Sequence, residues 1–94
     1  MPPISINTSA MLEFLVGLLN TPSPTGMTDG AIAYCEQAFA PFGLPMRRTT
    51  KGALVIEWPG KASTAPRALT AHVDTLGGMV KEVKGNGRLK LTKI

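Results

Sequence analysis

His72 and Asp74 are the residues whose types and spacing predict chemistry in this chain of 94 residues. His72 is the single histidine, and Asp74 follows it two positions later. In an extended segment, side chains two residues apart point to the same side, so the Asp74 carboxylate can reach the imidazole ring. A carboxylate placed there fixes the tautomer of a metal-binding histidine and raises its basicity. The spacing therefore fits a metal ligand, His72, that is oriented by Asp74, although a lone histidine is more often a structural or surface residue.

The residues that lead into this pair predict a strand that presents it. Residues 67–72 have the near-continuous apolar character of a strand covered on both faces, and Gly77-Gly78 follow the pair. We expect this strand to be central in an α/β fold, with two helices packed on the sheet. Leu12, Leu15 and Leu19 recur at helical spacing and are expected to be buried against that sheet.

Helices are predicted over residues 9–20 and 28–40. Thr8 or Ser9 can cap the first helix, and the proline-rich stretch 21–26 ends it. Thr28 or Asp29 can cap the second helix, which Pro41 and Gly43 end.

Two strand hairpins are also predicted. Residues 46–50 and 53–58 flank Lys51-Gly52, and residues 79–84 and 88–93 flank the stronger turn Gly85-Asn86-Gly87. Ile94 falls within the second hairpin pattern, which would leave a strand half paired. We therefore expect the sequence to be a fragment of a longer chain.

Composition limits the class of protein. The apolar content of 44% is normal for a globular protein and argues against disorder. Cys35 is the only cysteine, which excludes an intrachain disulfide, fits a reducing compartment and predicts the cytoplasm. Its helical pattern favours a small core side chain over a nucleophile. We expect no signal peptide, and no apolar run approaches the roughly 20 residues of a membrane span.

The charge is +4 overall and unevenly distributed. Residues 47–94 hold all ten basic side chains, whereas residues 1–46 hold only acidic ones. The sequence lacks the interleaved aromatic residues of a single-strand nucleic-acid binder, so we expect no nucleic-acid partner. The basic side chains of the second hairpin fit a solvated face better than a binding surface for an acidic partner. They are Lys81, Lys84, Arg88, Lys90 and Lys93.

The order of these elements and the segment 71–83, Ala-His-Val-Asp-Thr-Leu-Gly-Gly-Met-Val-Lys-Glu-Val, resemble a known family. Asn86-Gly87-Arg88-Leu89 and Pro22-Ser23 also fit it. The chain is similar to the N-terminal part of the glutamyl aminopeptidases and tetrahedral aminopeptidases, which are metallopeptidases with two metal ions. The resemblance extends over essentially the whole chain, about the first quarter of a typical member.

The resemblance implies a three-layer α/β catalytic domain over residues 1–78 and the start of an inserted β-rich domain over residues 79–94. It implies that His72 binds one of two divalent ions, usually zinc or cobalt, and that Asp74 is the catalytic-site carboxylate that orients it. A metal-activated water would hydrolyse the N-terminal residue from a peptide substrate. The other ligands would come from later in the chain, so the isolated chain is expected to be inactive. The insert would form homo-oligomer contacts.

Asp74-Thr75-Leu76-Gly77 stands where members usually carry Asp-Glu-Ile-Gly. This version resembles the subgroup associated with osmoprotectant gene clusters. Asp-Thr also occurs in the related branch of zinc carboxypeptidases and deacylases, but the continuation over residues 79–83 favours the aminopeptidases. Two alternatives remain beside the aminopeptidase: a zinc deacylase or carboxypeptidase of that sister branch, and a non-enzymatic basic interaction module.

Overall fold

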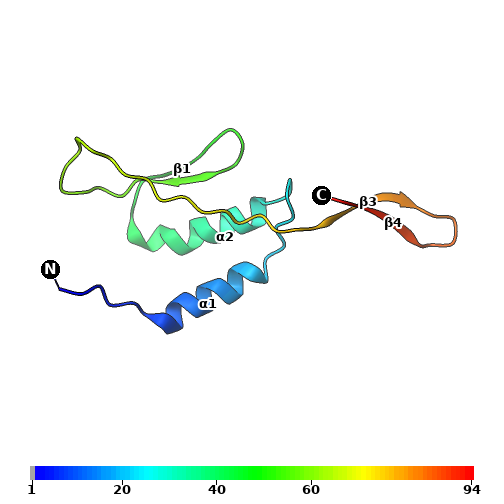
Figure 1. Ribbon diagram of the computed structural model, residues 1–94, viewed down its shortest axis with the longest axis horizontal. Helices are drawn as coiled ribbons and strands as arrows, with labels where there is room; N and C mark the ends of the chain where they lie inside the picture. Colours follow the sequence, from blue (N-terminus) through cyan, green and yellow to red (C-terminus); the bar gives the residue numbers. More distant parts are fainter. Residues whose placement is uncertain (1) are drawn as a thin grey trace.

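The computed structural model describes residues 2–94, which contain helices and two small antiparallel sheets, in agreement with an α/β class (Figure 1). Each sheet has two strands. In chain order, the elements are α1 (Thr8–Leu19), α2 (Asp29–Phe39), a short 3-10 turn η1 (Ala40–Phe42), β1 (Met46–Arg48), β2 (Leu54–Ile56), β3 (Gly78–Val83) and β4 (Leu89–Lys93).

Helix α1 is capped at its start by Asn7. The Asn7 side chain accepts a hydrogen bond from the backbone N–H of Ala10 at 3.1 Å, so the prediction of Thr8 or Ser9 as the cap was wrong by one residue. Asparagine is as good a cap as serine because its side-chain oxygen reaches the same free N–H groups. At the other end, the Thr21 hydroxyl donates to the carbonyl of Gly17 at 2.9 Å, and Pro22 prevents continuation.

Helix α2 packs against α1 through one aromatic pair. The rings of Phe14 and Tyr34 have centroids 5.4 Å apart, and the Tyr34 hydroxyl donates to the carbonyl of Phe14 at 3.1 Å. Such pairs contribute about 0.5–1.5 kcal/mol beyond the area they bury. Gly17 lies directly under the Tyr34 ring, where a Cβ would collide with the hydroxyl. Glycine at this position therefore permits the close approach of the two helices.

The predicted β1–β2 hairpin is confirmed and is tied to α2. Arg47 pairs with Val55, and Gly52 makes the turn with a φ of 90°. The guanidinium of Arg48 donates two hydrogen bonds to the Glu36 carboxylate of α2. This ion pair raises the pKa of Arg48, chiefly through the hydrogen bond to Glu36. It holds the hairpin beside the helix.

The predicted β3–β4 hairpin is also confirmed and extends from one end of the molecule (Figure 1). Gly87 has a φ of 81°, which the turn requires. The register shifts between Val80 and Glu82, which leaves Lys81 as the extra residue of an irregular pairing. The backbone N–H of Ile94 donates to the carbonyl of Gly77 at 3.1 Å and closes the base of the hairpin.

The predicted buried strand over residues 67–72 is absent from the described structure. This segment is extended but pairs with no other strand, and its residues are exposed; Leu69 is fully so. An apolar run becomes a strand only where another strand accepts its hydrogen bonds, and none of residues 2–94 does so here. The prediction that residues 67–72 form a paired, buried strand is therefore wrong.

Few side chains are buried in this arrangement. The Cα radius of gyration is 18.2 Å, against about 13 Å for a compact domain of 100 residues. Within residues 2–94 the buried apolar side chains are Ala31 and Ile32 alone. The expected burial of α1 is therefore wrong, because Leu12, Leu15 and Leu19 are each at least 44% exposed. Neither described helix is long and apolar enough to cross a membrane.

Replacement of Gly17 by alanine tests the helix contact. We expect Gly17→Ala to destabilise the fold by about 1–3 kcal/mol, because the added methyl group must displace Tyr34. Gly30→Ala in the first turn of α2 is the matched control, since its new Cβ would lie no closer than 3.6 Å to another atom. The control should be neutral or up to about 1 kcal/mol more stable, as helix propensity dictates. Urea unfolding followed by circular dichroism measures both, and equal stabilisation of the two variants would contradict the contact.

Candidate metal-ligand site

The segment that carries His72 is attached to the loop after α1. Pro24 and Thr75 form an isolated parallel bridge. The backbone N–H of Thr75 donates to the carbonyl of Ser23 at 2.8 Å, and the N–H of Thr25 donates to the carbonyl of Thr75 at 3.3 Å. The Thr75 hydroxyl also donates to the Ser23 carbonyl at 3.1 Å, which makes a third hydrogen bond between the two segments. Residues about fifty positions apart in sequence are thereby held side by side.

Gly77 allows the two segments to approach this closely. A Cβ built on Gly77 would lie 2.7 Å from the Cβ of Pro24, a distance that real side chains do not adopt. Ser23, the first residue of the contact, is only 3% exposed. The bridge therefore has a tightly packed centre in an otherwise open molecule.

Asp74 lies next to this bridge, and both of its carboxylate oxygens have partners. Oδ1 is 3.0 Å from Nδ1 of His72, and Oδ2 accepts a hydrogen bond from the Thr25 hydroxyl at 2.9 Å. The predicted contact between His72 and Asp74 is thus present in the structure. The two side chains lie on the same side of an extended segment, as their spacing requires.

These contacts determine which nitrogen of His72 is free. Hydrogen bonds from Thr25 and then from His72 hold the pKa of the Asp74 carboxyl below its usual value. The carboxylate is therefore ionised at neutral pH and can only accept hydrogen bonds. In the neutral imidazole, the contact at 3.0 Å consequently assigns the hydrogen to Nδ1, and the Nε2 lone pair is left available.

The donor chemistry of the pair fits one corner of a metal site. The His72 side chain is 83% exposed, so its Nε2 is open to a ligand. A neutral imidazole nitrogen suits zinc and other first-row metals. Throughout residues 2–94, however, no three side chains of the types His, Cys, Asp and Glu lie close enough together to hold an ion. The described residues therefore offer one candidate ligand, His72, and the carboxylate in contact with it.

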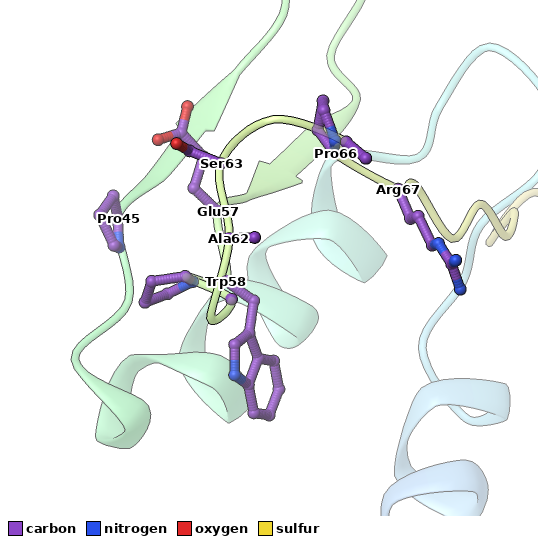
Figure 2. A pocket seen from close by; sticks show the side chains of 10 residues that line it. Pro45, Glu57, Trp58, Ala62, Ser63, Pro66 and Arg67 are labelled. Atoms are coloured by element: carbon purple, nitrogen blue, oxygen red, sulfur yellow. The ribbon is translucent and has the colours of Figure 1, made fainter.

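A cavity lies elsewhere in the described structure. It has a volume of about 680 Å³ and is formed by the loop after β2, with Pro45 at one end and Arg67 at the other (Figure 2). Trp58 contributes an exposed indole to its wall. Neither His72 nor Asp74 lines it, so the cavity is separate from the pair.

Two other features noted in the sequence are away from His72. Cys35 is half-buried in α2, and burial raises the pKa of its thiol, which suits a packing role. The basic side chains of β3, β4 and their turn are exposed, as expected for a solvated hairpin.

Comparison with known proteins gives this geometry a context. Residues 52–94, which include the whole His72–Asp74 segment, match the model of the M42 glutamyl aminopeptidase family. The chain resembles the M42 glutamyl aminopeptidases. The predicted resemblance is therefore confirmed. The chain is also 45% identical over 83 residues to a Bacillus subtilis (strain 168) protein named "Putative aminopeptidase YhfE". That alignment includes 88% of this chain, which spans 24% of the length of the relative.

One residue in contact with Asp74 was missed from the sequence. Thr25 lies 49 positions before Asp74, and no local pattern could place its hydroxyl on that carboxylate. The only signal was its position in the loop Thr-Pro-Ser-Pro-Thr-Gly, in which two prolines restrict the backbone.

Replacement of Gly77 by alanine tests the bridge. We expect Gly77→Ala to separate Pro24 from Gly77 and to weaken the hydrogen bonds of Thr75, because the new Cβ cannot fit at 2.7 Å. Amide hydrogen exchange should then be faster at Thr75 and Thr25. Gly85→Ala is the control, since its Cβ would meet no atom within 4 Å. Unchanged protection of Thr75 in Gly77→Ala would show that the close approach is not required.

Proposed function

We propose that this chain belongs to a two-metal aminopeptidase, in which His72 binds a divalent ion through Nε2 and Asp74 orients the ring. The observation that carries the proposal is the contact of 3.0 Å between His72 Nδ1 and Asp74 Oδ1, which leaves Nε2 exposed. It lies within the residues that match the M42 family. The substrate proposed is a peptide with a free N-terminus, as aminopeptidase chemistry requires.

The residues of this chain have limited roles in that reaction. Asp74 accepts the Nδ1 hydrogen and so keeps the Nε2 lone pair available, because only a deprotonated nitrogen coordinates a metal. When bound, a pair of zinc or cobalt ions would supply a water of near-neutral pKa and would polarise the scissile carbonyl, with His72 as one of the residues that would hold them. The general base and the remaining ligands are proposed to come from residues outside the 94.

The arrangement of the elements supports a proposed division of the chain. Residues 1–78 are proposed to belong to the catalytic domain, a three-layer α/β domain in which residues 67–72 gain strand partners. Residues 79–94 are proposed to begin an inserted β-rich domain that makes homo-oligomer contacts. In support, β3 and β4 form a sheet of their own that extends away from the helices (Figure 1). The lone Cys35 supports a proposed cytoplasmic location.

Substitution of the pair in the complete protein tests the proposed activity. Asp74→Ala should lower the zinc affinity or activity by roughly 10- to 100-fold, because the ring loses the group that orients it. His72→Ala should lose at least as much, and Glu82→Ala, which removes an exposed carboxylate of β3, should lose nothing. The assay is hydrolysis of amino-acid p-nitroanilides after chelator treatment and reloading with zinc or cobalt.

Two outcomes of this assay would contradict the proposal. Full activity of both His72→Ala and Asp74→Ala would remove the pair from the site. Cleavage of N-acylated substrates in place of those with a free amino group would favour a deacylase of the sister branch.

Metal analysis of the isolated 94-residue chain tests whether the other metal ligands come from residues outside the 94. We expect no stoichiometric zinc after gel filtration, because a tetrahedral site needs about three protein ligands and residues 2–94 bring no three candidates together. Elemental analysis provides the measurement. One tightly held zinc ion per chain would contradict the statement that further ligands come from outside these residues.

A further inference from the structure

The Thr25 hydroxyl is the only described group besides His72 that donates a side-chain hydrogen bond to Asp74. It reaches Oδ2 at 2.9 Å, while Oδ1 faces His72 Nδ1 at 3.0 Å. A carboxylate held at one oxygen can rotate about its terminal bond, since that torsion is broad. A carboxylate held at both oxygens by groups from different segments has one orientation. Thr25 and His72 thus hold Asp74 from two sides.

Thr25 is itself fixed relative to Asp74. Its backbone N–H donates to the carbonyl of Thr75, the residue after Asp74, at 3.3 Å. The same carbonyl lies 3.4 Å from the Thr25 hydroxyl, which is farther than the 2.9 Å to Asp74 Oδ2. Its side chain is β-branched and therefore stiff about χ1. Pro24, immediately before it, packs on Gly77. The hydroxyl is consequently anchored to the same short segment that carries the carboxylate.

One further polar contact joins the pair: His72 Nδ1 also lies 3.3 Å from the backbone carbonyl of Asp74, which can share the hydrogen on Nδ1. The side chain of Asp74 is 45% exposed and that of His72 is 83% exposed. An exposed pair of this kind is weakened by solvent and by the side-chain entropy lost in forming it. A second, anchored donor reduces that entropy loss, because the carboxylate is already oriented when the imidazole meets it.

We infer that Thr25 is a positioning residue, which orients Asp74 so that His72 holds its hydrogen on Nδ1 and presents Nε2 to a ligand. The metal part of this inference rests on the proposed function, whereas the effect on the imidazole does not. In this role Thr25 would touch neither the metal nor the substrate. It acts through Asp74 alone.

The tautomer of His72 provides a test that requires no metal and no activity. In the complete, chelator-treated protein labelled with ¹⁵N-histidine, the ring-nitrogen signals of His72 are those that are missing from the spectrum of His72→Ala. In alkaline buffer, where imidazole side chains are neutral, the signals report which nitrogen carries the hydrogen. The unsubstituted chain should show mainly the Nδ1–H form. Thr25→Val keeps the shape of the side chain and its backbone N–H, and should shift the population toward Nε2–H.

Two variants separate this role from a general effect on the loop. Thr25→Ser retains the hydroxyl and should restore the Nδ1–H form. Thr21→Val is the matched control, because the Thr21 hydroxyl lies in the same loop but donates to Gly17 and not to Asp74. The inference is overturned if Thr25→Val leaves the tautomer unchanged, if Thr21→Val shifts it equally, or if the unsubstituted chain already shows the Nε2–H form.

Zinc affinity of the complete protein tests the metal part. Thr25→Val should weaken binding by up to about tenfold, less than the roughly 10- to 100-fold expected for direct loss of an orienting partner, and Thr25→Ser should bind like the unsubstituted protein. Unchanged affinity in Thr25→Val would overturn this part. If the complete protein bound no zinc, the proposed function would fail while a tautomer shift would still establish the role of Thr25 on Asp74.

Discussion

The tie between residues 23–25 and Thr75 is the constraint on which the rest of this site depends. Residues 57–77 lie between two hairpins and, apart from this bridge, join no helix or strand in the described part of the chain. Without the hydrogen bonds of Thr75, His72 and Asp74 would lie on a free segment. The bridge attaches the segment of His72 and Asp74 to the short loop after α1, whose backbone is restricted by prolines. The position of these two residues therefore depends on the position of α1.

Two residues near Asp74 strengthen this tie in different ways. Gly77 has no side chain, and Pro24 therefore packs directly on its backbone. Thr75 contributes a hydroxyl on a short side chain, which donates to the Ser23 carbonyl within the bridge.

The sequence predicted what local signals determine. Prolines at positions 22 and 24 ended the first helix as expected, and Asn86-Gly87 turned the second hairpin at the predicted place. The alternation His72–Val73–Asp74 predicted the contact that the structure shows. Strand pairing of residues 67–72 and burial of α1 could not follow in the same way. Both depend on neighbouring segments, and residues 2–94 supply none that covers them.

The most direct test of the account is the position of the metal in the complete protein. Crystals grown with zinc and measured at its absorption edge would locate each ion by anomalous scattering. We predict an ion bonded to Nε2 of His72 at about 2.0–2.1 Å, with Nδ1 still facing Asp74. An ion bound to Nδ1, or zinc sites that leave His72 without a metal, would contradict it.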